Sequence, residues 1–151
     1  MFGVEDSLVS TVGLLSGISI AGVANHTIIM TGLVLIFVEA ISMGAGSFLS
    51  ESSAELYEHQ KDSELSRSYT DALIMFCSYL VAGFVPLLPY LLLPSEQAFL
   101  GSIGVSLMLL LVLGIINAEV SRTSVWKSVL RMVLVGGAAI LIGSAVGGVF
   151  G

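Results

Sequence analysis

The fold is decided by long apolar runs such as Thr27–Leu49, TIIMTGLVLIFVEAISMGAGSFL, in which Glu39 is the one charged residue. About 20 predominantly apolar residues in a helix cross the hydrocarbon of a bilayer, so this run is long enough to span it. In the whole chain of 151 residues, 56% are hydrophobic and 11% are charged, and the mean hydropathy is +1.02. This composition is too apolar for a soluble domain of this length and predicts an integral membrane protein.

Five such runs nearly exhaust the chain: residues 7–25, 27–49, 70–93, 97–118 and 128–150. They lack the alternating pattern of barrel strands, and a helix satisfies its own backbone hydrogen bonds in lipid. We therefore expect an all-α protein whose residues 1–151 form a single domain of five transmembrane helices. The single cysteine, Cys77, excludes an internal disulfide and any multi-cysteine metal site.

The basic residues predict the orientation of the chain in the membrane. With five spans, the N-terminus, the hydrophilic connection 50–68 and the connection after the fourth span share one side. All the basic residues fall on that side: Lys61, Arg67, Arg122, Lys127 and Arg131. Positive residues gather on the cytoplasmic side, so we expect a cytoplasmic N-terminus and a C-terminus on the opposite side.

The connection 50–68 is short and acidic. Glu51, Glu55, Glu58 and Asp62 are spaced by four, three and four residues, which places them on one face if the segment is helical, and His59 follows Glu55 by one turn. Such a strip of oxygen ligands with one imidazole is a candidate for capturing divalent cations from the cytosol. A solvated acidic face explains the same spacing.

Glycine and proline residues predict how the helices pack. Gly13 and Gly17 in the first span, and Gly143 and Gly147 in the last, have the four-residue spacing that allows two helices to approach closely in lipid. In the third span, Pro86 removes a backbone donor and clashes with the preceding turn. We expect the helix to kink or unwind there unless neighbouring groups compensate.

Glu39 lies about midway along the second span, where an acidic side chain costs about 2.5 to 3.5 kcal/mol on insertion scales. It therefore needs a partner, a proton or a water-filled cavity. Met43 follows one helical turn later, on the same face. The first span begins with a second acid, Asp6, followed at helical spacing by Ser10. If these two faces met, they would line a polar path.

The side chains of this path indicate a class of ion. Carboxylate oxygens suit hard and borderline cations, and the thioether of Met43 helps a softer metal such as Fe²⁺ more than Mg²⁺ or Ca²⁺. A carboxylate in lipid tends to hold a proton and to release it when a cation binds, which gives a basis for exchange of metal for protons. Alternatively, Glu39 is a structural hydrogen-bonding group and Met43 fills space.

Four segments resemble the vacuolar iron transporter family, in order along nearly the whole chain: EDSLVSTVGLLSGISIAG (5–22), EAISMGAGSFLSESS (39–53), GFVPLLPY (83–90) and WKSVLRMVLVGGAA (126–139). The resemblance implies a five-helix protomer and a homodimer with the metal path between its subunits. It also implies export of cytosolic Fe²⁺, often with Mn²⁺, in exchange for protons. The family's path residues fall on Asp6, Glu39 and Met43.

The chain departs from this family at three places. Ser7 follows Asp6 where the family commonly has glycine, and Ser47 and Phe48 replace an acid and a tyrosine in the family's MGxGEY motif. The long cytoplasmic metal-binding helices of plant-type members are reduced here to residues 50–68. We therefore regard Glu51, Glu55, Glu58 and His59 as at most a reduced capture site.

These observations predict a multi-pass transporter of Fe²⁺ and Mn²⁺ without a prosthetic group, in a prokaryotic cell membrane or a eukaryotic vacuolar membrane. A metal sensor or scaffold that binds iron without moving it is the alternative. An enzyme is disfavoured because His26 and His59 are expected on opposite sides of the membrane and no nucleophile and base stand at useful spacing. A net charge of -6 disfavours binding to nucleic acid.

Overall fold

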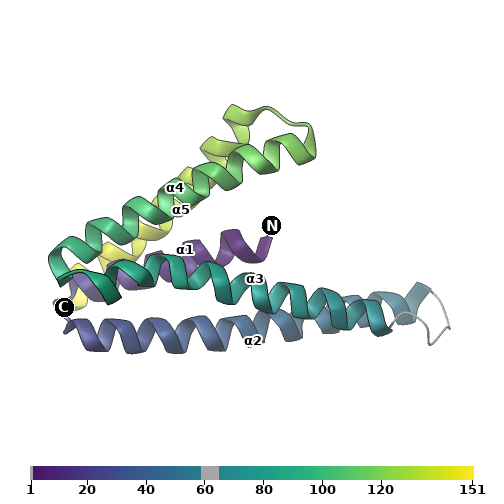
Figure 1. Ribbon diagram of the computed structural model, residues 1–151, viewed down its shortest axis with the longest axis horizontal. Coiled ribbons are helices and arrows are strands. Elements are labelled where there is room, and N and C mark those ends of the chain that lie inside the picture. The colour runs from purple at the N-terminus through teal and green to yellow at the C-terminus, as the bar shows by residue number, and fades with distance from the viewer. Residues whose placement is uncertain (1, 59–64) are drawn as a thin grey trace.

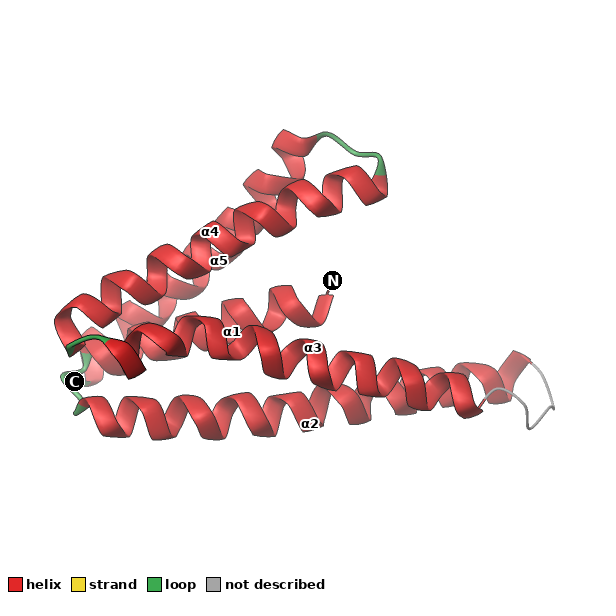
Figure 2. Ribbon diagram, in the orientation of Figure 1, coloured by secondary structure: helices red, strands yellow, loops and turns green. Residues whose placement is uncertain are grey.

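The computed structural model describes residues 2–58 and 65–151, without the side chains of residues 54–58, 65–67, 95 and 96. The described residues are helical apart from short connections, and no strand occurs among them (Figure 2). The helices are α1 (Phe2–Ile20), α2 (Asn25–Glu58), α3 (Leu65–Leu92), α4 (Ser95–Ser121) and α5 (Val125–Phe150). The all-α prediction is confirmed.

Four of the helices contain segments long and apolar enough to cross a membrane: Asn25–Ser53, Ser68–Leu92, Gln97–Ser121 and Val125–Phe150. The shorter α1 does not join this group because Glu5, Asp6 and several serines lower its hydropathy. However, α1 packs against each of the other four helices. Its neighbours bury much of its surface, so it needs less apolar surface than they do. The protein is thus a multi-pass membrane protein.

The helices are arranged as two antiparallel pairs with α1 between them (Figure 1). One pair is α2 and α3, and the other is α4 and α5, which diverges from the first pair toward the α4–α5 connection. At the opposite end, the C-terminus lies beside the α1–α2 and α3–α4 connections. The N-terminus of α1 points into the divergent end.

Two buried clusters join α1 to these pairs. In the first, Leu15 of α1 packs with Ile36 of α2 and Leu87 of α3. In the second, Leu8 of α1 packs in a group that includes Met132 of α5. Because lipid tails are as apolar as these side chains, such contacts stabilise the bundle through close packing rather than through exclusion of water.

The helix bounds differ most from the expected spans in α1 and α2. The first helix covers residues 2–20 rather than 7–25. It ends where Gly22 takes a φ of 73°, a left-handed conformation that glycine adopts at little cost and that commonly terminates helices. The second helix continues beyond residue 49 to Glu58, so much of the acidic connection extends α2.

The prolines do not unwind α3, which is helical through both Pro86 and Pro89. The sequence predicted a kink or unwinding at Pro86 unless neighbouring groups compensated, and α3 does not unwind there. Pro86 and Leu87 are buried, and the Ser102 hydroxyl of α4 donates a hydrogen bond of 2.7 Å to the Pro86 carbonyl. Packing against α4 and α2 holds the backbone helical although the prolines supply no N–H donors.

Candidate metal path

The carboxylate of Glu39 is held by hydroxyls from two other helices. The Ser10 hydroxyl of α1 lies 2.9 Å from Glu39 Oε2 and 2.7 Å from Tyr79 Oη of α3. The Tyr79 hydroxyl donates to the same carboxylate oxygen. Three helices therefore converge on one acidic side chain.

The position of Tyr79 is fixed by its surroundings. Its side chain is 0% exposed, and its backbone carbonyl accepts a hydrogen bond of 2.7 Å from the buried Ser7 hydroxyl. A buried tyrosine hydroxyl needs a partner, and Glu39 supplies it. The resulting bonds compensate part of the cost of placing a carboxylate in the bundle.

The hydroxyls leave part of the carboxylate available. Among the described residues, the hydrogen bonds to Glu39 end on Oε2. The other oxygen, Oε1, makes no hydrogen bond to a residue that the structure describes. Serine and tyrosine hydroxyls both donate and accept, so Ser10 and Tyr79 can accommodate Glu39 in its charged or its protonated form.

Glu39 and Asp6 line one pocket of about 610 Å³. Ser10 and Leu35 also line it, and Leu35 precedes Glu39 by one helical turn on α2. The rest of the lining is mostly apolar and comes from α1 and α5. Both acids are half-buried in the protomer. The pocket thus joins the two acidic faces that the sequence places at the start of α1 and in the middle of α2.

The far wall of this pocket depends on close contact between α1 and α5. A Cβ added to Gly17 would lie 2.7 Å from the carbonyl oxygen of Gly143. Cβ atoms added to Gly143 and Gly147 would in turn meet the backbones of Gly13 and Gly17. The predicted close approach at both glycine pairs is confirmed, and the two pairs are each other's partners.

Met43 does not line the pocket of Asp6 and Glu39. It borders a neighbouring pocket of about 320 Å³ with Ser47, Glu51 and Met75. Met75 belongs to α3, and its sulfur packs against Gly3 of α1. The structure therefore separates the sequence-predicted path residues into two adjacent groups: an all-oxygen pair and a group containing thioethers.

The remaining capture residues are only partly described. Glu51 is half-buried on α2. Glu55 and Glu58 belong to the last turns of α2, but their side chains lie outside the described residues, and so does His59 as a whole. The described residues contain no group of three or more His, Cys, Asp or Glu side chains close enough to hold a metal ion.

The donor set fits a divalent cation that also takes ligands from elsewhere. Asp6, Glu39 and Ser10 offer hard oxygen donors, which suit Mn²⁺ and Fe²⁺. Two carboxylates fill only part of the coordination sphere of such an ion. For such an ion to bind here, water or a second copy of the chain would have to supply the rest.

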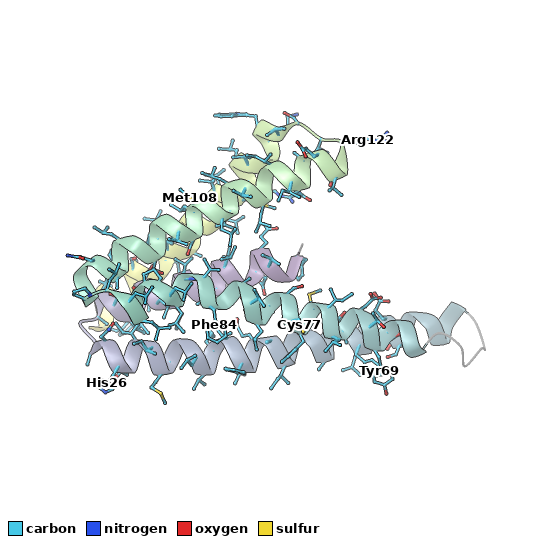
Figure 3. The ribbon with its side chains drawn as sticks, viewed as in Figure 1. His26, Tyr69, Cys77, Phe84, Met108 and Arg122 are labelled. Carbon is cyan, nitrogen blue, oxygen red and sulfur yellow. The ribbon has the colours of Figure 1, made fainter. Side chains whose placement is uncertain are left out.

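Sequence reasoning did not single out Tyr79 or Met75. A tyrosine in the middle of an apolar run is a usable signal for Tyr79, because its hydroxyl has to find a partner away from water. Met75 carries no comparable signal, since methionine commonly fills space in helix packing. By contrast, the single cysteine is exposed on α3 between Tyr69 and Phe84 (Figure 3).

Comparison with known proteins identifies the family. The model of the VIT family matches residues 1–68 and 57–148, and the two matches overlap around the α2–α3 connection. Vacuolar iron transporter 1 of Oryza sativa subsp. japonica is 35% identical over 74 residues, which cover 48% of this chain and 29% of the rice protein. Since the family model matches nearly the whole chain, the protein belongs to the VIT family.

Proposed function

We propose that this protein is a transporter that moves divalent iron, and also manganese, out of the cytosol in exchange for protons. The observation that carries the proposal is the pocket in which Asp6 of α1 and Glu39 of α2 come together inside an apolar helix bundle. Family membership supports metal transport, and the rice relative is named as an iron transporter.

The two pockets suggest an order of metal contacts. One of the two pockets lies nearer the divergent end of the bundle and is bordered by Glu51, Met43 and Met75. We assign this end of the bundle to the cytoplasmic side. Thioethers there favour Fe²⁺ over Mg²⁺ and Ca²⁺, which are abundant in cells and prefer oxygen. From this outer pocket the ion passes to Asp6 and Glu39.

Proton exchange follows from the surroundings of Glu39. Ser10 and Tyr79 hold Oε2 of this carboxylate by hydrogen bonds. A cation and a proton compete for the same carboxylate, so binding of a cation there is coupled to release of a proton. Reprotonation from the far side then weakens the metal contact, so the ion leaves on the side of the C-terminus.

A homodimer would complete the path. In the single protomer the pocket is open at the surface, so Asp6 and Glu39 would face lipid unless another protein surface covered them. Charged groups at this depth are costly. A second copy related by a two-fold axis covers the pocket and contributes its own Asp6 and Glu39, doubling the number of oxygen ligands.

Metal flux into proteoliposomes tests transport. We expect native protein to admit Fe²⁺ and Mn²⁺ and Asp6→Asn to admit at least tenfold less, whereas Glu119→Gln, an exposed acid at the end of α4, stays near the native rate. Bound iron without flux from a correctly folded protein would instead support a sensor or scaffold.

Cross-linking tests the dimer. In a Cys77→Ser background, Leu35→Cys places one thiol in the pocket, and Leu111→Cys places one on an exposed face of α4. We expect oxidation in membranes to couple two copies through position 35 and not through position 111. Coupling at position 111 alone would contradict this interface.

A further inference from the structure

A polar pocket of about 410 Å³ lies at the α4–α5 connection, remote from the metal path. Each residue that lines it is polar or basic, and none of these is acidic: Asn117, Ser121, Thr123, Lys127, Ser128 and Arg131. In a chain with a net charge of -6, a concave surface with two basic residues and no carboxylate in its lining favours anions over cations.

Two cationic side chains define the charge of this pocket. Lys127 and Arg131 are four residues apart on α5, so they lie on the same face of the helix. Neither forms an ion pair with any residue that the structure describes, and their charges are therefore available. Arginine binds phosphate oxygens with two parallel hydrogen bonds, and lysine adds a mobile point charge.

The helix end adds to this positive field. Ser124 is the N-cap residue of α5, but its side chain makes no capping hydrogen bond, and the first turn contains no acid. The free N–H groups and the positive end of the helix dipole thus remain uncompensated next to Lys127. Phosphate groups bind readily at such helix ends when basic side chains are also present.

Neutral hydrogen-bonding groups form the floor of the pocket. The Asn117 amide donates to the Ser128 hydroxyl at 3.2 Å, and Ser128 is nearly buried. The Ser121 hydroxyl lies 3.4 Å from the amide oxygen of Asn117. This small network adds neutral polar groups to the lining without introducing negative charge.

The surroundings of the pocket are those of a membrane interface. Trp126, next to Lys127, is 75% exposed, as expected for a tryptophan at headgroup level. Val120, Val125 and Leu130 are exposed beside it and would contact acyl chains. If a lipid phosphate binds here, its acyl chains can contact this exposed apolar surface. A free phosphate ion would make no use of that surface.

We propose that this pocket binds the phosphate of an anionic phospholipid headgroup, with Lys127 and Arg131 as its main contacts and the acyl chains along α4 and α5. The site is independent of metal transport. Arg122 provides a matched control, because it lies on the same connection but does not line the pocket (Figure 3).

Native mass spectrometry of the detergent-purified protein tests the site with phosphatidylglycerol and phosphatidylcholine as probes. We expect the native protein to retain phosphatidylglycerol selectively. Lys127→Gln and Arg131→Gln should each weaken it about fivefold, and the double variant about thirtyfold, from the contribution of one basic residue near an anionic surface. Arg122→Gln should change it less than twofold.

Three results would overturn the proposal. If Arg122→Gln weakens binding as much as Lys127→Gln, the attraction is diffuse surface charge. If inorganic phosphate displaces the lipid at equal concentration, the occupant is the free ion. If the double variant Lys127→Arg, Arg131→Lys, which preserves both positive charges, binds no more lipid than the double glutamine variant, the positive charges at these two positions do not hold the phosphate.

Discussion

Replacing Gly17 with alanine should force α1 and α5 apart. The added Cβ would lie 2.7 Å from the carbonyl oxygen and 3.2 Å from the carbonyl carbon of Gly143. Both are backbone atoms, so no change of rotamer relieves the overlap. To reach the 3.4 Å of ordinary van der Waals contact, the nearer distance must grow by about 0.7 Å.

The energetic cost follows from this displacement. Overpacking of a well-packed interface costs about 1 to 3 kcal/mol. For a chain of this length, each kcal/mol lowers the midpoint of thermal unfolding, Tm, by about 2 to 4 °C, so we expect a loss of about 2 to 12 °C. Gly17 also lines the pocket of Asp6 and Glu39, so transport should fall together with stability.

Circular dichroism of the purified protein in detergent measures this loss. Gly137→Ala is the matched control, because Gly137 lies on α5 like Gly143 but has no atom within 4 Å of its added Cβ. We expect Gly137→Ala to retain or slightly raise the native Tm, since alanine favours helix. A Gly17→Ala protein as stable as Gly137→Ala would refute the reasoning about α1 and α5.

Three further predictions concern the site and its supports. Tyr79→Phe removes the hydroxyl that donates to Glu39, so it should lower the free energy of unfolding by about 1.5 to 3 kcal/mol. Tyr69 is exposed, so Tyr69→Phe should change the free energy of unfolding very little. Thermal unfolding of the two variants measures the difference. Mn²⁺ at about 100 times its Kd should stabilise the native protein by about 2.7 kcal/mol, which is measured as a rise in Tm. If Mn²⁺ raised the Tm of Glu39→Gln by the same amount, binding at that carboxylate would be contradicted. Ser102→Ala removes the bond to the Pro86 carbonyl and should cost about 0.5 to 1.5 kcal/mol, measured as a lower Tm.

Hydropathy predicted the helices because lipid leaves a spanning segment few other structures. Hydropathy predicted the bounds of α1 less well, because no change in composition separates the first apolar run from the second. The end of α1 depends instead on the left-handed backbone conformation of Gly22. Pro86 predicted a kink or unwinding unless neighbouring groups compensated. Contacts from other helices, such as that of Ser102, lie outside any local pattern, so the sequence could not decide between these outcomes.

The candidate site was predicted in part for similar reasons. The cost of a charge in lipid singled out Glu39, and helical spacing placed Ser10 on the same face as Asp6. Spacing along one helix cannot reveal which residues of another helix meet it. Tyr79 therefore became visible only through its contact with Glu39, and Met43 was grouped with Glu39 although it borders a different pocket.

The most direct measurement of the central claim is Fe²⁺ flux into proteoliposomes with and without a pH gradient, for the native protein, Glu39→Gln and Glu119→Gln. We expect the gradient to drive flux in the native protein and in Glu119→Gln. The flux of Glu39→Gln should be at least tenfold lower than that of the native protein and should no longer respond to the gradient. Equal, gradient-driven flux in all three proteins would show that Glu39 is structural and would contradict the proposed exchange of metal for protons at this carboxylate.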